Sequence, residues 1–361
     1  MLLQTRPAAQ ARPERRSTRP ESLPQVDVIV AFHNEARLLP DKLANLLDLD
    51  YPADLLRFVL VDGKSTDGSL AIAETAAQGD SRFTVVRSPV ANKTLQINLA
   101  LTRCRAPWVL YTDVDAHLPE NTLRELVAVV APDPRIAVAG VLHRPGCSTS
   151  FDQRHWRFWN ASRRFERRTG STSAVLGPCY LFRRNWLFTL PADVIADDMY
   201  VSFAALASGR RIALAETLVI ERRAPGGTVP VLFHKIRKAR ALLREVLRFL
   251  PRARRTPSPM RELFLWRAAV TMAAPPAILA AFVVSLAIAP AAGTVFWLMG
   301  LACCFFPLEE RMPWRLGRTA IAVAALVGLG LTLACVLCVA LVSLPFVSQQ
   351  ASFSRWRQEE R

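Results

Sequence analysis

The chain has 361 residues, more than one small domain requires, and hydrophobic residues make up 51% of it. Its formal net charge of +16 is compatible with nucleic acid, an anionic membrane surface or a phosphorylated substrate, so the position of the charge has to discriminate among them. Residues 268–308 and 319–354 contain no charged side chain, which excludes a chain that is water-soluble throughout.

The N-terminal residues 1–24 carry five arginines among Pro, Gln and Ser, and they lack the apolar core of a secretory signal peptide. We expect a disordered basic arm in the cytosol. The seven cysteines are scattered, and four of them lie in apolar runs, which favours a reducing cytosol over a disulfide framework.

Residues 25–229 alternate short β-branched runs with amphipathic stretches, the pattern of a sheet covered by helices. We therefore expect an α/β domain with a mostly parallel sheet of about seven strands. The predicted strands are 26–32, 58–62, 83–87, 108–112, 136–141, 175–182 and 212–219, and the predicted helices are 36–48, 68–78, 93–103, 119–130, 152–168 and 198–208.

Polar clusters follow three of these strands: His33-Asn34-Glu35, Asp62-Gly63-Lys64-Ser65 and Asp113-Val114-Asp115. In open α/β sheets ligands bind at the carboxyl ends of the strands, so these clusters predict one binding edge. Two Asp at i and i+2 can offer hard oxygen ligands to Mg²⁺ or Mn²⁺, although a D-x-D alone also occurs in solvated turns. Asp62 is placed to accept a hydrogen from a nucleobase.

An aromatic and basic stretch, residues 151–159, precedes the last predicted elements of this domain. It suits an acceptor site near a membrane, because Trp and Arg are at home at an interface. An equally good interpretation is a helix that uses Trp156 and Trp159 as core anchors.

Residues 230–258 combine an apolar 3–4 periodicity with many Lys and Arg. We expect an amphipathic helix and linker lying on a membrane, with a surface helix packed on the domain as the alternative. Basic residues next to apolar spans follow the positive-inside bias, and no recognisable nucleic-acid module accompanies them, so we expect no nucleic-acid partner.

Residues 262–354 are predicted to form a membrane region with about three transmembrane helices. The run 268–308 is long enough for two spans with a turn near Pro290, and residues 319–347 supply a third. Arginines in the loop 309–318 favour its placement in the cytosol. The basic tail would then lie outside, so either it departs from the charge bias or the last segment does not cross fully.

Taken together, these motifs resemble family 2 glycosyltransferases with the GT-A fold, over about residues 26–240. That fold has a mixed, mostly parallel sheet with flanking helices. The matching stretches are residues 28–35, 61–69, Asn92-Lys93 with Asn98, 112–116, 177–184, 196–200 and 208–211.

The resemblance implies an inverting, metal-dependent enzyme that uses a nucleotide-sugar donor, expected to be a UDP-sugar. It implies that Asp198 is the catalytic base, with Asp197 as the alternative. The donor-binding residues that it implies are His33, Asn34, Glu35, Asp62, Lys93 and Asp113. It also implies that Asp113 and Asp115 are ligands of Mg²⁺ or Mn²⁺. Arg237 and Arg240 would meet the diphosphate or lipid headgroups.

The resemblance has departures: Gly63-Lys64 replaces a common acidic-Gly pair, and residues 234–240 lack the Trp of the (Q/R)xxRW motif. The missing Trp argues against a processive polymer synthase. We expect a hexosyl- or N-acetylhexosaminyltransferase that acts at the cytoplasmic face of the inner membrane on a hydroxyl of a lipid-linked or polysaccharide acceptor. The alternative function is a catalytically silent nucleotide-sugar-binding scaffold of a polysaccharide export system.

Overall fold

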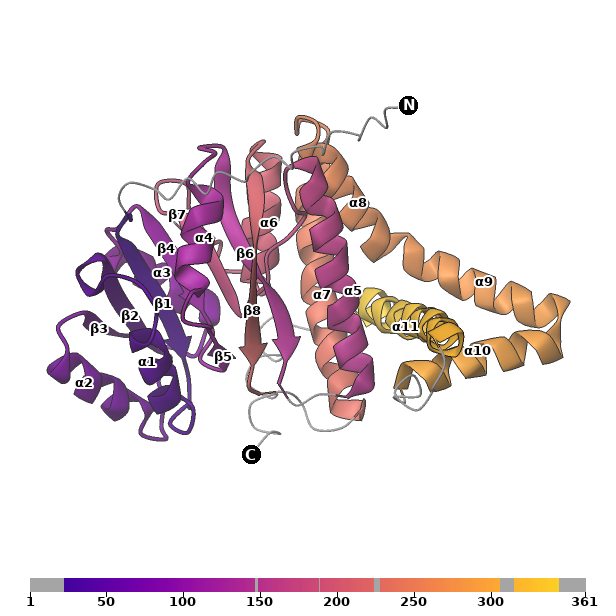
Figure 1. The fold of residues 1–361 in the computed structure, drawn as a ribbon, viewed down its shortest axis with the longest axis horizontal. Helices are drawn as coiled ribbons and strands as arrows, with labels where there is room; N and C mark the ends of the chain where they lie inside the picture. Colours follow the sequence, from indigo (N-terminus) through magenta and orange to yellow (C-terminus); the bar gives the residue numbers. More distant parts are fainter. Residues whose placement is uncertain (1–22, 147–148, 188, 224–227, 306–314, 344–361) are drawn as a thin grey trace, which may run out of the picture.

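The structure, a computed structural model, describes residues 23–146, 149–187, 189–223, 228–305 and 315–343. An α/β domain is followed by a helical region that extends away from one side of the sheet (Figure 1). The expected arm at residues 1–24 lies almost wholly outside the described residues, as does the basic tail.

The sheet is mixed and mostly parallel, with the order β3-β2-β1-β4-β7-β6-β8-β5. Strand β7 is antiparallel to both of its neighbours, whereas β1, β2, β3 and β4 run parallel to one another. The strands are β1 Val26–Phe32, β2 Leu56–Asp62, β3 Phe83–Arg87, β4 Trp108–Thr112, β5 Ala116–His117, β6 Ile136–Pro145, β7 Cys179–Arg183 and β8 Arg211–Glu221.

Within the described residues the sheet has eight strands, one more than the approximately seven that the sequence predicts. The additional strand, β5, has only two residues, so it carries no periodicity that a sequence could reveal. It pairs antiparallel with the end of β8, where Ala116 lies opposite Glu221. Because of this pairing, the residue after Asp115 is fixed against the last residue of β8.

Two hydrophobic cores cover the two faces of the sheet, because successive strand side chains point to opposite sides. Val28 and Val30 of β1 pack with α1, α2 and α4, whereas Ile29 packs with α3 on the opposite face. The helices are α1 Leu39–Leu47, α2 Ser69–Gly79, α3 Lys93–Arg103, α4 Thr122–Val130, α5 Ser150–Glu166 and α6 Asp197–Ala207.

Helix α7, Thr228–Ala253, contains the expected amphipathic helix. Much of its apolar stripe is covered by protein: Val246 and Phe249 join the core on the α6 side, and Ala239 and Leu243 pack against α11, Arg315–Ser343. The stripe is therefore not free to enter a membrane along its whole length. Contact between α7 and a membrane stays a prediction.

Among the C-terminal helices, α9 Ala274–Ile288 continues the course of α8 Met260–Met272 away from the sheet, and α10 Pro290–Phe305 turns back toward it before α11 (Figure 1). The expected turn falls at Pro290, where α10 begins. Among the described residues one continuous helical stretch, Met260–Ile288, is long and apolar enough to span a membrane, and shorter apolar stretches occur at Pro290–Cys303 and Val327–Ala340. The number of spans stays a prediction.

Candidate active site

The loops after β1 and β2 are joined to each other at the edge of the sheet. The backbone amide of Asn34 donates a hydrogen bond to Ser65 Oγ at 3.0 Å. The backbone amide of Thr66 donates one to the side-chain oxygen Oδ1 of Asn34 at 2.8 Å. Asn34 has a φ of 54°, which Asn tolerates better than most residues. The two predicted clusters therefore form one rim.

Asp62 is the last residue of β2 and is buried. Its carboxylate accepts hydrogen bonds from the amides of Lys64 and Ser65, so it holds the turn that follows it. A side chain at Gly63 would place a Cβ 2.8 Å from the Gln96 amide nitrogen. That amide is fixed by hydrogen bonds to two backbone carbonyls, which is why the turn requires glycine.

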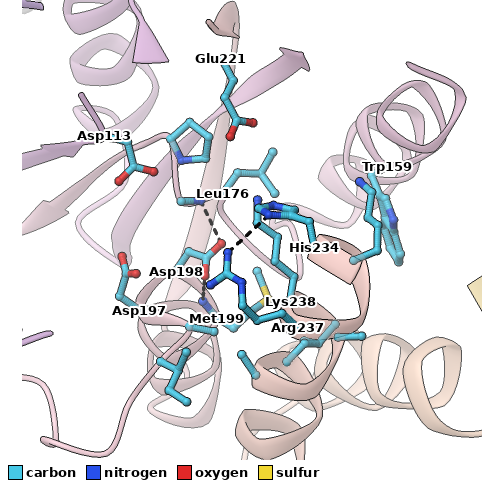
Figure 2. A pocket seen from close by; sticks show the side chains of 18 of the residues that line it. Asp113, Trp159, Leu176, Asp197, Asp198, Met199, Glu221, His234, Arg237 and Lys238 are labelled. Atoms are coloured by element: carbon cyan, nitrogen blue, oxygen red, sulfur yellow. Dashed lines mark hydrogen bonds between the residues drawn. The ribbon is translucent and has the colours of Figure 1, made fainter. Parts of the chain in front are cut away.

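One large cavity, of about 310 Å³, opens beside this rim. Its lining extends from the ends of β1, β4 and β8 across the start of α6 to α5, α7, α8 and α11. Figure 2 shows Asp198 near its centre, with Asp113 and Asp197 on one side and His234 and Arg237 on the other. The cavity thus joins the sheet edge to the helical region.

Asp113 and Asp115 both line the cavity, as the D-x-D pattern predicts. Asp113 accepts a hydrogen bond of 2.7 Å from the Tyr111 hydroxyl. Burial, together with the nearby Glu221 and Asp113 carboxylates, raises the pKa of Asp115 to about 8. Carboxylates that lie this close together repel one another, so a cation bound between them would stabilise their charged forms.

Lys42 supports this segment from the protein interior. Its ammonium donates to Thr112 Oγ1 at 2.8 Å and to the Ala116 carbonyl at 2.6 Å, on either side of the two aspartates. Burial lowers the pKa of Lys42 to about 8, against the raising effect of neighbouring acidic groups. The residue was not singled out from the sequence, because a Lys in an amphipathic helix usually faces solvent.

Lys93 lies between the carboxylates of Asp113 and Asp197. Its ammonium lies 3.1 Å from Asp113 Oδ1 and 3.1 Å from Asp197 Oδ1. It also lies 4.6 Å from the centre of the Tyr111 ring. Burial alone would lower the pKa of Lys93, but Asp113 and Asp197 raise it above its usual value, so the side chain is a fixed cation.

The two aspartates at the start of α6 have different environments. Asp197 is 3% exposed and is bound by Lys93 and by the Tyr180 hydroxyl. Asp198 accepts hydrogen bonds from the backbone amides of Gly177 and Met199, both at 2.9 Å, and lines the cavity (Figure 2). Burial raises the pKa of Asp198 to about 6, with Asp197 as the next contributor.

A divalent metal fits the donor atoms that line this edge. Asp113 and Asp115 offer hard oxygen atoms, and their mutual repulsion with Glu221 would be relieved by a cation. Within the described part of the chain, no group of three His, Cys, Asp or Glu side chains is arranged to hold a metal. The remaining ligands would therefore have to come from water or from a bound phosphate.

Several lining residues were missed from the sequence. Glu221, the last residue of β8, lies 3.1 Å from His143, and Arg223 forms an ion pair with Glu35 across the cavity edge. A carboxylate two positions after the predicted strand 212–219 was the available signal for Glu221. Nothing in the local sequence indicates the Arg223 to Glu35 contact, which spans 188 positions.

The structure brings together Glu35, Lys93, Asp113, Asp115, Asp197, Asp198 and Arg237 in the lining of this cavity. His33, Asn34 and Asp62 lie on the adjoining rim outside that lining. Arg240 also lies outside it, one position beyond the buried Ala239 of α7. Trp156 and Trp159 both line the cavity, so the aromatic stretch does reach the site.

Comparison with known proteins gives matches over the α/β domain. The family model described as Glycosyl transferase family 2 matches residues 27–189. Proteins named N-acetylglucosaminyltransferase, from Mesorhizobium japonicum and Rhizobium meliloti, are each 28% identical, over 63% and 68% of this chain. The chain spans 58% and 61% of the length of these two relatives.

A solved structure resembles the chain over most of its length. It is the mannosyltransferase PcManGT from Pyrobaculum calidifontis in complex with GDP-Man and Mn²⁺, with a TM-score of 0.70 and 26% sequence identity. The likeness covers 91% of this chain and 88% of that one, so it includes most of the C-terminal helical region as well as the sheet.

Proposed function

Because the chain belongs to the family 2 glycosyltransferases and has a GT-A fold, we propose that it transfers one sugar from a nucleotide-sugar donor to an acceptor hydroxyl, with inversion. The observation that carries the proposal is the position of Asp198. It faces the cavity without an ion pair among the described residues, while the adjacent Asp197 is held by Lys93.

In the proposed reaction the acceptor oxygen attacks the anomeric carbon as the bond from that carbon to the nucleoside diphosphate breaks. The acceptor proton passes to the Asp198 carboxylate, and the nucleoside diphosphate leaves with the bonding electrons. Asp197 is a positioning residue, because its contacts with Lys93 and Tyr180 hold the start of α6. No covalent sugar intermediate is needed for a single displacement.

Asp113 and Asp115 would hold the divalent metal, Mg²⁺ or Mn²⁺, and Lys93 would lie beside the donor. The metal, when bound, supplies positive charge to the departing diphosphate. Glu35 lies at the cavity, and His33, Asn34 and Asp62 lie on the adjoining rim. In the proposed complex these residues would contact the base and ribose.

We further propose a UDP-sugar donor, with N-acetylglucosamine as the first sugar to test, since the named relatives are N-acetylglucosaminyltransferases. The GDP-mannose of the structural relative is the competing choice. The acceptor is a lipid-linked or polysaccharide hydroxyl at the cytoplasmic face of the inner membrane. The apolar stretch Met260–Ile288 supports a membrane location by its length and composition.

The test incubates the purified chain with Mn²⁺, a lipid extract and either UDP-N-acetylglucosamine or GDP-mannose carrying a radiolabelled sugar. We expect label in the extracted lipid or polysaccharide with one donor only, and its loss in Asp198→Asn. If a donor binds to the wild-type protein but no sugar is transferred to any acceptor, the alternative of a silent scaffold holds.

A further inference from the structure

Arg267, in α8, is a buried cation that the proposed donor site does not use. The residue is 6% exposed and lines the cavity. Among the residues that the structure describes, its Nε and Nη1 groups have no hydrogen-bond acceptor, and it forms no ion pair. A guanidinium in this position has lost most of its water. The Glu166 and Asp198 carboxylates attract it, but neither forms an ion pair with it among the described residues.

Its packing does not compensate for this burial. The guanidinium lies over the Trp159 ring, 3.9 Å from the ring centre. A cation–π contact offsets only part of the free energy that burying an unpaired charge costs. Arg267 is therefore best explained as half of an interaction whose anionic partner is a ligand.

The surroundings of Arg267 add positive charge. Arg163 is fully buried nearby, and burial, followed by the Arg267 guanidinium, lowers its pKa to about 9. Glu166 is already bound by the Ser173 amide at 2.8 Å and by Ser162 at 3.2 Å. Lys238 of α7 also lines the cavity and forms no ion pair within the described part of the chain.

The carboxylates of the cavity lie at the sheet edge, where Asp113 and Asp115 would hold the donor diphosphate through a metal. The cations on that side, Lys93 and Arg223, are already paired with carboxylates, whereas Arg267 on α8 has no ion pair among the described residues. An anion on the helical side would be a second anion, separate from the donor. Asp198 lies between the two sides (Figure 2), which is where an acceptor hydroxyl must be placed.

Beyond Arg267 the lining becomes apolar. Val270 follows on the same face of α8, and Leu333, Val336 and Leu337 of α11 also line the cavity. Within the apolar stretch Met260–Ile288, Arg267 lies about 10 Å from the first residue. A charged group and an apolar chain thus have adjoining surfaces in one cavity.

We propose that Arg267 binds the phosphate of an amphiphilic acceptor, a lipid phosphate or diphosphate, whose chain lies against Val270, Leu333 and Val336 and whose head group reaches Asp198. Phosphate suits a guanidinium because two N–H groups can bind two of its oxygens at once. The inference rests on the proposed function, and it selects a phosphorylated lipid acceptor over a free polysaccharide.

The test measures binding to the full chain in a non-ionic detergent by calorimetry, with farnesyl phosphate, farnesol and inorganic phosphate as separate probes. We expect farnesyl phosphate to bind at least about tenfold more tightly than either other probe, since it offers both the charge and the chain. Equal affinity for farnesol and farnesyl phosphate would overturn the proposal. Tight binding of inorganic phosphate alone would also overturn it, in favour of a soluble anion.

Variants identify the residue responsible. Arg267→Gln should bind farnesyl phosphate no more tightly than farnesol, and Arg267→Lys should keep part of the preference. The matched control is Arg261→Gln on the same helix, because Arg261 is exposed and paired with Glu262. Val336→Trp should weaken binding of both lipids. A full preference remaining in Arg267→Gln would contradict the assignment.

Nucleotide binding separates this inference from the proposed function. UDP and GDP are titrated with Mn²⁺, and the nucleotide that binds the wild type should bind Arg267→Gln with equal affinity, which also shows that the variant is folded. A parallel loss of nucleotide affinity in a variant with an unchanged melting temperature would place Arg267 on the donor and overturn the acceptor assignment. Lipid binding requires no turnover, so it can succeed where sugar transfer fails.

Discussion

The Tyr180 hydroxyl donates a buried hydrogen bond of 2.8 Å to Asp197 Oδ2. Together with Lys93 on the other oxygen, this bond occupies both oxygens of the Asp197 carboxylate. Among the described residues, the adjacent Asp198 carboxylate accepts hydrogen bonds from backbone amides alone, and it lines the cavity. The two neighbouring carboxylates thus differ in their contacts, and this difference is the basis for proposing different roles for them.

We predict that the two aspartates fail differently when changed to Asn. Asp198→Asn should lower turnover by about 10²–10⁴-fold with donor affinity unchanged, because only the proton acceptor is lost. Asp197→Asn should lower the free energy of unfolding by about 3 kcal/mol, since Lys93 loses a buried partner. Turnover, donor calorimetry and denaturant unfolding are compared. Near-normal turnover in Asp198→Asn would transfer the role of base to Asp197.

A second prediction concerns pH. Burial and Asp197 raise the pKa of Asp198 to about 6, so the carboxyl is protonated below that value and can act as a base only above it. The value of kcat/KM should therefore rise about tenfold per pH unit below pH 6 and level off above it. The profile is measured at saturating Mn²⁺, with donor binding checked at each pH. A flat profile between pH 5 and pH 8 would contradict the assignment.

A substitution in the proposed metal site should weaken binding of the nucleotide-sugar donor. Asp115→Ala removes a hard oxygen ligand, so we expect Mn²⁺-dependent donor affinity to fall by at least about tenfold, along with turnover. Calorimetry with and without Mn²⁺ measures this. Asp54→Asn, at an exposed carboxylate outside the cavity lining, is the control and should bind donor normally. Equal donor affinity in Asp115→Ala and Asp54→Asn would remove Asp115 from the metal site.

Lys42 should affect metal binding from a distance. Lys42→Met leaves Thr112 Oγ1 and the Ala116 carbonyl without their buried donor. We expect the free energy of unfolding to fall by about 1–3 kcal/mol and the Mn²⁺-dependent affinity for donor to fall as well. Arg37→Met, at an exposed position, is the control. A stability loss with unchanged donor and metal affinity would limit Lys42 to a structural role.

The membrane topology can be tested directly. We predict that residues 1–250 and the loop 309–318 are cytosolic, with three spans between residues 268 and 347, because arginines flank the uncharged segments. A reporter that is active only in the cytosol is fused after Arg318 and, separately, after Arg361. An inactive reporter after Arg318, in a fusion that is produced and inserted in the membrane, would rule out the two spans predicted within residues 268–308. The Arg361 fusion decides on which side the tail lies.

The binding edge could be predicted from the sequence because strand periodicity and polar strand ends are local properties. The predicted bounds of β1, β3 and β4 agree with the structure, and the clusters after β1, β2 and β4 lie at one edge as expected. Parallel strands bring their carboxyl ends together whatever the rest of the chain does. The family resemblance added roles for Asp113, Asp115 and Asp198 that spacing alone does not supply.

Only the tertiary structure decided which faces meet. The apolar stripe of α7 could have faced lipid, but residues more than ninety positions away in α11 cover part of it. The sequence placed Arg267 at the edge of an uncharged run, with nothing to indicate Trp159 beneath it. Periodicity determines which side of a helix is apolar, whereas the partner of that side depends on long-range packing, which no local pattern encodes.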